Sequence, residues 1–369
     1  MKIICLQENL IKGLQVVSHL AGKNSNLPIL NNILITADDG IITLTTTNLE
    51  IGISCKIRGK VEKKGQCTVQ ARLITDFISL LPKDNIVLEY GDNKLKVNCD
   101  NNTSFINTLN PEDFPLLPKI NKESEYVINI QDLKNALKKV SFAVSYDSVR
   151  PEISGVLISL ENERATFVGT DSYRLAEKSI NTNKLPDEKH VIVPLDTIQE
   201  ISRIINYETE NEVKLYIDEN QILFGINGIE LVSRLIEGSY PDYKQIIPKE
   251  SKTKAEVNTI ELTQAIKRTS LFCKPGINDI KLTFVSEKGE FVINSMSDQI
   301  GESMTVVKAN IDGVDNEIVF NYKYILDVLS NIDSSTVSFE MIDNKTSGII
   351  KTKDDEEYLY IISPIRQQN

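Results

Sequence analysis

The sequence predicts an α+β protein made of three tandem, similar domains. Three segments have apolar residues at the i, i+4 and i+7 spacing of a helix that buries one face. From Leu10 to Leu133 is 123 residues, and from Leu133 to Leu262 is 129 residues. A repeat of domain size indicates three folded copies of one domain rather than a solenoid. The three stripes are Leu10, Leu14 and Val17; Leu133, Leu137 and Val140; and Leu262, Ile266 and Thr269, in which threonine takes the last apolar position.

Each copy begins with an extended apolar run, followed by a predicted helix and then a hairpin. The runs after the helices are rich in β-branched residues and end in turn residues such as Asp38-Asp39-Gly40, which predicts strands. The helices are expected at 8–20, 131–144 and 260–274, the next strands at 29–35, 153–158 and 280–284, and their hairpin partners at 41–46, 165–169 and 290–295.

A second half of the same kind follows in each copy. Strands end at Val69, Val193 and Val319, and each leads into another predicted helix. Antiparallel hairpins with helices gathered on one face indicate an α+β architecture of six half-units. The second helices are expected at 71–81, 195–206 and 322–332, followed by hairpins at 86–90 and 94–98, 213–217 and 222–226, and 337–341 and 348–351.

Proline-rich segments set the expected boundaries. The stretches 110–118 and 239–248 close the first two copies, and the polar runs 119–125 and 249–256 are interpreted as linkers. The expected domains are therefore 1–120 (N-terminal), 126–248 (central) and 254–369 (C-terminal).

The composition is that of an ordinary globular protein. It is 41% hydrophobic and 25% charged, shows no signal-peptide pattern at its start, and lacks an apolar segment near the ~18 residues of a membrane span. We therefore expect a soluble, cytoplasmic protein. Five cysteines without a CxxC pair and only two histidines leave little material for a zinc site or histidine catalysis, so no metal and no cofactor are expected.

The charge is unevenly distributed. The formal net charge is −11, which taken alone argues against nucleic acid as a partner. The helical segments together with a few flanking residues, however, contain 12 basic and seven acidic residues, so they carry +5 while the remainder carries −16; the segments counted are 8–23, 71–83, 131–144, 195–206, 260–274 and 321–332. One interpretation is that lysine occupies solvated helix faces because it is a good helix former. The alternative is that the helices face one polyanion and the sheets face solvent.

Five ordered motifs resemble those of a known family, the bacterial β sliding clamps, which are the processivity subunits of replicative DNA polymerase III. Together the motifs span essentially the whole chain, and their combination is specific although each alone is weak. They are Leu27-Pro28-Ile29-Leu30 with Asn32; Gly169-Thr170-Asp171-Ser172-Tyr173-Arg174-Leu175-Ala176; Tyr240-Pro241-Asp242-Tyr243 through Ile247-Pro248; Phe320-Asn321 with Tyr324; and Ser363-Pro364-Ile365-Arg366.

The resemblance implies the clamp fold: a ring-shaped, head-to-tail homodimer with helices lining a central hole and antiparallel sheets outside. Twelve helices spaced about 10 Å apart around a circle give an axis-to-axis diameter of about 38 Å. After one helix diameter of about 10 Å is subtracted, the hole is wider than a B-form duplex, whereas the ring formed by the six helices of one chain is too small. The implied function is to encircle duplex DNA without sequence preference and to tether the polymerase, with no catalysis by the clamp itself.

The resemblance and the basic helices together indicate DNA-facing residues. Family members often carry an arginine near the position of Asn24, where this chain has Lys23 instead. The expected DNA-binding residues are Lys12, Lys23, Asn24, Arg72, Lys134, Lys138, Arg203, Lys267 and Arg268.

The resemblance also implies an apolar pocket that receives aromatic and aliphatic anchors of short partner peptides. Ser363 stands where the family commonly has methionine, and Gln367-Gln368-Asn369 extends the usual end. The alternative for Leu175, Ile246 and Ile362 is that they are ordinary core residues. The expected pocket residues are Ile153, Thr170, Ser172, Tyr173, Arg174, Leu175, Pro241, Ile246, Asn321, Tyr324, Ile361, Ile362, Ser363, Pro364, Ile365 and Arg366.

The partners implied by the resemblance are duplex DNA, a second copy of the chain, the polymerase III alpha subunit, the clamp loader, other polymerases, ligase and mismatch-repair proteins, with no membrane. A hydrolase using Asp171 and Arg174 is the rival enzyme hypothesis, but no converging catalytic partners accompany them. The acidic run 354–357 is interpreted as a solvated turn. A peptide-binding scaffold that does not bind DNA is the second rival.

Overall fold

The computed structural model describes residues 1–22, 27–147, 149–207 and 210–365. The chain divides into two compact units, which are described separately. The first unit comprises Met1–Ile130 and Gln199–Leu235, and the second comprises Gln131–Ile198 and Ile236–Asn369.

Six α-helices occur in the described ranges, at the six places where the apolar periodicity predicts them. Their apolar stripes are buried as expected: Leu10, Leu133 and Leu262 are each 0% exposed. Several helices end before the predicted residue. The helices are α1 (Gln7–Ser18), α2 (Ala71–Ser79), α3 (Ile130–Ser141), α4 (Leu195–Tyr207), α5 (Thr259–Ser270) and α6 (Tyr322–Ser330).

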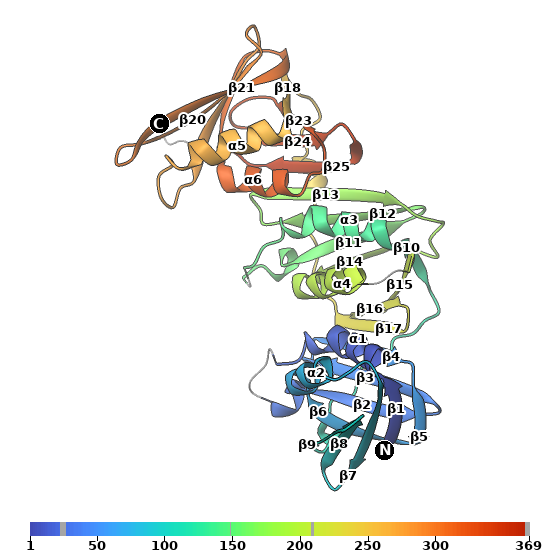
Figure 1. Cartoon of the computed structure of the whole chain (residues 1–369). Coiled ribbons are helices and arrows are strands. Elements are labelled where there is room, and N and C mark those ends of the chain that lie inside the picture. Colours follow the sequence, from blue (N-terminus) through green and yellow to red (C-terminus); the bar gives the residue numbers. More distant parts are fainter. Residues whose placement is uncertain (23–26, 148, 208–209, 366–369) are drawn as a thin grey trace. The chain divides into compact units, whose positions relative to one another are not determined.

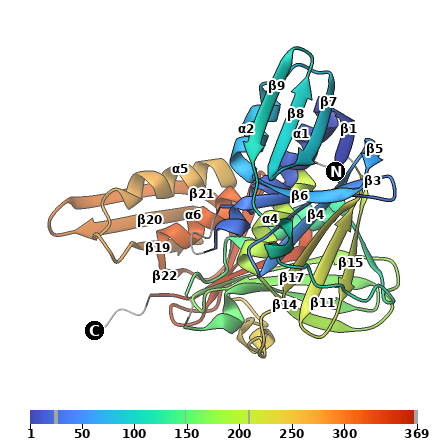
Figure 2. The same cartoon turned by 90° about the horizontal axis from the view of Figure 1, so that it is seen from below.

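The first unit contains two antiparallel sheets, and α1 and α2 lie side by side in it (Figures 1 and 2). The five-stranded sheet has the order β5 (Lys60–Lys63), β1 (Lys2–Leu6), β7 (Asn85–Gly91), β8 (Lys94–Cys99) and β9 (Asn102–Asn107). The eight-stranded sheet has the order β10 (Tyr126–Asn129), β15 (Glu212–Ile217), β16 (Gln221–Ile226), β17 (Ile229–Arg234), β4 (Ile51–Ile57), β3 (Ile41–Thr47), β2 (Asn32–Asp38) and β6 (Gly65–Gln70).

The second unit is organised around one 12-stranded antiparallel sheet. Alternate residues Ile280, Leu282 and Phe284 are buried, as the period of two in a half-buried strand requires. In Figures 1 and 2, α5 runs along β20 and β21, and α6 lies beside α5. The order is β14 (Lys189–Pro194), β11 (Gly155–Glu161), β12 (Arg164–Thr170), β13 (Arg174–Asn181), β25 (Asp355–Ile362), β24 (Gly348–Thr352), β23 (Thr336–Met341), β18 (Thr253–Asn258), β21 (Gly301–Gly313), β20 (Glu290–Ser297), β19 (Asp279–Val285) and β22 (Asn316–Asn321).

Equivalent strands join successive repeats. In the first unit, β17 of the second repeat pairs with β4 of the first, with Leu231 opposite Ile53. In the second unit, β25 of the third repeat pairs with β13 of the second, with Ile361 opposite Leu175. The same pairing rule therefore joins two different pairs of repeats.

Two local sequence predictions are wrong. The strands expected at 29–35 and 153–158 begin later, because Pro28–Asn31 and Pro151–Ile153 form 3₁₀ turns. Proline fixes φ at a helical value and supplies no N–H, so it favours the first position of such a turn. The linker expected at 249–256 is also too long, because β18 begins at Thr253 and pairs with β21 and β23.

Candidate functional site

A short loop from Thr170 to Arg174 connects β12 to β13 and forms the centre of the candidate peptide site. Gly169 brings this loop close to the end of α3. A Cβ at Gly169 would lie 2.4 Å from the backbone oxygen of Val140, which is closer than real Cβ atoms approach. Only glycine therefore permits this approach of β12 to α3.

Side-chain oxygens hold the loop in one conformation. The Asp171 Oδ1 atom accepts hydrogen bonds from the backbone N–H groups of Tyr173 (2.9 Å) and Arg174 (3.0 Å). Thr170 Oγ1 donates to the Arg174 carbonyl at 2.6 Å and accepts from the Ser172 N–H at 3.2 Å. Ser172 has φ of 77°, in the left-handed region, and its side chain accepts from Arg150 at 2.9 Å.

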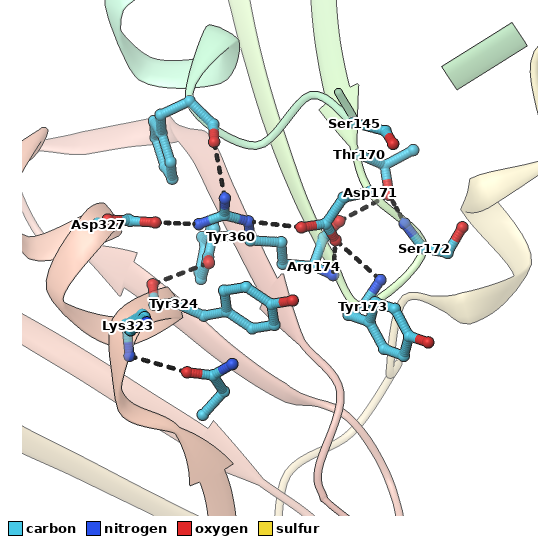
Figure 3. A network of polar contacts seen from close by, with 12 residues as sticks. Ser145, Thr170, Asp171, Ser172, Tyr173, Arg174, Lys323, Tyr324, Asp327 and Tyr360 are labelled. Carbon is cyan, nitrogen blue, oxygen red and sulfur yellow. Dashed lines mark hydrogen bonds and ion pairs between the residues drawn. The ribbon is translucent and has the colours of Figure 1, made fainter. Parts of the chain in front are cut away.

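Arg174 joins the loop to α6. Its Nε donates to Asp171 Oδ2 at 2.9 Å, and its terminal nitrogens donate to the Phe142 carbonyl at 2.9 Å and to Asp327 of α6 (Figure 3). The guanidinium carbon also lies 4.5 Å from the centroid of the Tyr324 ring, within cation–π range. Arg174 is thus engaged on all sides by its own chain.

The surroundings stabilise the charge on Arg174. Burial disfavours the cation, but the hydrogen bond and charge of Asp327 and the charge of Asp171 outweigh it and raise the pKa of the guanidinium above its ordinary value. Burial raises the pKa of Tyr360 well above that of a free tyrosine, and the neutral Tyr360 hydroxyl donates to the Tyr324 carbonyl at 2.9 Å. Asp171 and Asp327 thus both pair with one arginine.

The C-terminal segment runs beside this loop. The Ser363 N–H donates to the Tyr173 carbonyl at 2.8 Å, and the Ile365 N–H donates to the Val319 carbonyl at 2.8 Å. The loop and residues 363–365 are consequently adjacent although they are almost 200 positions apart.

An apolar cluster lies under the same region. Tyr240 and Ile247 are partly buried against it, and the Tyr240 hydroxyl donates to the Val168 carbonyl at 3.3 Å. This cluster makes the region beneath the loop apolar. Its buried members are Leu157, Val168, Leu175, Ile192, Tyr243 and Ile361.

The predicted pocket residues divide into a buried group and an accessible group. Arg174, Asn321 and Tyr324 are partly exposed. Asn321 caps α6, because its side-chain oxygen accepts a hydrogen bond from the Lys323 N–H. Arg366 and the tail 367–369 lie outside the described residues. Ile153, Thr170, Leu175, Ile361 and Ile362 are buried. Tyr173 and Ile246 are 64% and 53% exposed, Ser172 is exposed, and Pro241, Ser363, Pro364 and Ile365 are intermediate.

Leu175 and Ile362 therefore belong to the core, which was the alternative left open by the sequence, whereas Ile246 presents its side chain to solvent. Three residues of the Arg174 network were not predicted. They are Phe142, Asp327 and Tyr360, and none has a sequence signal that distinguishes it from a neighbouring core or helix-surface residue.

Most predicted DNA-facing residues are exposed on helices. Lys23 and Asn24 lie outside the described residues. Arg203 differs: it donates to Glu200 at 3.1 Å and to the Val16 carbonyl at 2.6 Å, so its guanidinium holds α4 against α1. The exposed residues are Lys12, Arg72, Lys134, Lys138, Lys267 and Arg268.

The prediction of a solvated acidic turn is wrong for Asp355. Its carboxylate is 16% exposed and lies 2.5 Å from the ammonium groups of both Lys139 and Lys178. Glu357 of the same run pairs with Arg164. In the described ranges, no group of three or more His, Cys, Asp or Glu side chains could hold a metal ion, and no helix there is long and apolar enough to cross a membrane.

Known proteins similar to this chain match it along nearly its whole length. Models of the N-terminal, central and C-terminal domains of the DNA polymerase III beta subunit match residues 1–118, 127–242 and 244–366. Beta sliding clamps of Staphylococcus epidermidis and Staphylococcus aureus are 30% identical over 353 residues, covering 93% of each chain.

Solved structures agree with these matches. The DNA polymerase III beta subunit of Pseudomonas aeruginosa superposes with a TM-score of 0.95 at 27% identity, over 100% of both chains. The sliding clamp of Bacillus subtilis gives a TM-score of 0.93 at 29% identity, again over 100% of both chains.

Three repeated αβ domains, joined by one strand-pairing rule, define a three-domain clamp protein. The chain belongs to the DNA polymerase III beta subunit family, the beta sliding clamps. It is a processivity factor and a non-catalytic subunit of the polymerase.

Proposed function

We propose that two copies of this chain close head to tail into a ring around duplex DNA. The strand-pairing rule supports this most directly. The last strand of the second repeat, β17, pairs with β4 of the first repeat, and the last strand of the third repeat, β25, pairs with β13 of the second. The last strand of the first repeat is β9. In the third repeat, the strand equivalent to β4 and β13 is β21.

Strands β9 and β21 each have an open edge in the described structure. β9 pairs with β8 alone among the described strands, and residues 301–308 of β21 pair with β20 alone. Open edges are templates for pairing with another chain. Phe105 of β9 is 63% exposed, and Met304 of β21 is 68% exposed. Pairing β9 of one copy with β21 of another would bury both and continue the rule.

The helices would then face the DNA. We propose that Lys12, Arg72, Lys134, Lys138, Lys267 and Arg268 contact phosphates through the loose electrostatics that sliding requires. Lys23 and Asn24 remain part of this proposal. We leave Arg203 out, because its side chain is engaged with Glu200 and the end of α1.

The polymerase alpha subunit, the clamp loader and other replication and repair proteins would dock short peptides beside Tyr173 and Ile246. The exposed Tyr173 ring, the apolar cluster below it and the C-terminal segment support this assignment. We further propose domains 1–120, 126–248 and 254–369, and a cytoplasmic location.

The decisive experiment is topological. Clamp loaded on nicked circular DNA should stay bound during gel filtration and be lost once the circle is linearised. Equal retention on both forms would overturn the sliding mechanism, and absence from both would favour a peptide-binding scaffold without DNA.

A further inference from the structure

A cavity of about 280 Å³ lies in the first unit beside α1, whereas Tyr173 belongs to the second unit. Its walls come from α1, from the end of β4 and the residues after it, and from the turn between β16 and β17. The lining includes Asn9 and Lys12 of α1, Lys56 and Arg58 after the buried part of β4, and Asn227 of the turn.

Backbone packing fixes these walls. A Cβ at Gly13 would lie 2.5 Å from Ile57 Cγ2, so glycine allows α1 to lie directly on β4. The Lys56 N–H donates to the Gly228 carbonyl at 3.0 Å, which attaches β4 to the turn. The Asn9 side chain donates to the Arg58 carbonyl at 3.5 Å. The cavity is thus held by three elements that are bonded to one another.

The charged residues that line the cavity are positive, whereas the chain as a whole is negatively charged. The described lining of the cavity has three cations, Lys12, Lys56 and Arg58, and no carboxylate. Among the described residues, neither the Lys56 ammonium nor the Arg58 guanidinium forms an ion pair, although many surface lysines here do, such as Lys64 with Asp38. Two basic residues without an ion pair among the described residues therefore line one hollow in a chain whose net charge is −11.

We infer that this cavity is a phosphate-binding site and that its ligand is a backbone phosphate of duplex DNA. A guanidinium offers a planar fork of donors to phosphate oxygens, and an ammonium adds a compact point charge. The amides of Asn9 and Asn227 line the same space. The site would add Lys56 and Arg58, which lie outside the helices, to the DNA-facing residues. The inference rests on the proposed function.

The test is the salt dependence of duplex binding by the full-length dimer. The variant Lys56→Gln/Arg58→Gln removes two cations, and Lys184→Gln/Lys288→Gln removes two exposed lysines from loops of the second unit, so both change the net charge equally. Each phosphate contact adds about 0.9 to the slope of log K against log salt concentration, so the cavity variant should lose roughly 2 in slope. The control variant should keep the wild-type slope.

A slope equal to that of the control would overturn the inference. The exchange variant Lys56→Arg/Arg58→Lys preserves the charge and should retain the slope, which separates charge from folding. Saturable binding of inorganic phosphate that the cavity variant loses without a change in DNA slope would assign the site to free phosphate and overturn the DNA assignment. If wild-type protein neither binds duplex nor stays on circular DNA, the proposed function itself fails.

Discussion

The ammonium of Lys139 lies 2.5 Å from the carboxylate of Asp355, joining α3 of the second repeat to β25 of the third. Lys178 of β13 binds the other oxygen of the same carboxylate at 2.5 Å. The two lysine side chains are 9% and 8% exposed, so both depend on this carboxylate for charge compensation.

Replacing Asp355 by Asn should therefore destabilise the second unit strongly. Two buried ammonium groups would lose their counter-ion, and removing one member of a buried ion pair typically costs about 3–5 kcal/mol. Urea unfolding monitored by circular dichroism measures the loss. The control Glu356→Gln changes the charge equally at an exposed neighbour and should stay within about 0.5 kcal/mol of wild type. Equal stability of the two variants would contradict this role of Asp355.

The same carboxylate should make stability depend on pH. Burial alone would raise its pKa, but the hydrogen bonds from Lys139 and Lys178 outweigh burial and lower the pKa below the ordinary aspartate value. A lowered folded-state pKa contributes stability above the unfolded value of about 3.9, and this contribution is lost as pH falls through the folded pKa. Between pH 6 and pH 3, the unfolding free energy of wild type should fall more than that of Asp355→Asn. If the unfolding free energies of wild type and Asp355→Asn fell in parallel between pH 6 and pH 3, the titration of Asp355 would not contribute to the pH dependence of stability.

Arg174→Lys should weaken both folding and peptide binding. Lysine retains the charge but cannot reach Asp171, Asp327 and the Phe142 carbonyl together, so the loop that carries Tyr173 loses its anchor. A lost charged hydrogen bond is worth about 1.5–3 kcal/mol, which predicts at least about tenfold weaker binding. Fluorescence anisotropy with a short peptide bearing leucine and phenylalanine tests this. Arg164→Lys, at an exposed pair with Glu357, is the matched control and should bind normally.

Phe105→Glu should disrupt the proposed ring. Burying an unpaired carboxylate at the open edge of β9 costs several kcal/mol, so dimer affinity should fall roughly 100-fold or more. Sedimentation should then show a species near the chain mass of 41.5 kDa instead of twice that mass. Ile41→Glu introduces the same charge at a 48% exposed residue of β3 and should leave the dimer intact. A dimer that survives Phe105→Glu would place the interface elsewhere.

Gly169→Ala should destabilise the protein by about 1–3 kcal/mol, because the new methyl group would collide with the Val140 carbonyl of α3. Thermal unfolding measures the change. Gly91→Ala adds a methyl group where no atom lies within 4 Å, and it should be neutral or slightly stabilising. A neutral Gly169→Ala would show that α3 and β12 can separate at no cost.

Sequence reasoning recovered the repeat and the positions of the six helices, because helical periodicity is a local property. The residues from Thr170 to Arg174 were singled out only by the resemblance to the clamp family. Sequence reasoning did not recover Asp327 and Asp355, whose arginine and lysine partners lie 153 to 216 positions away. A carboxylate in an acidic run has the same sequence pattern whether it faces water or a buried ammonium. The pairing of β13 with β25 brings these groups together, and only the tertiary structure decides which charges are compensated. The open edges of β9 and β21 are likewise defined by which strands are already paired. The sequence by itself determined the number and kind of repeating elements, and the tertiary structure decided how their edges and charges are matched.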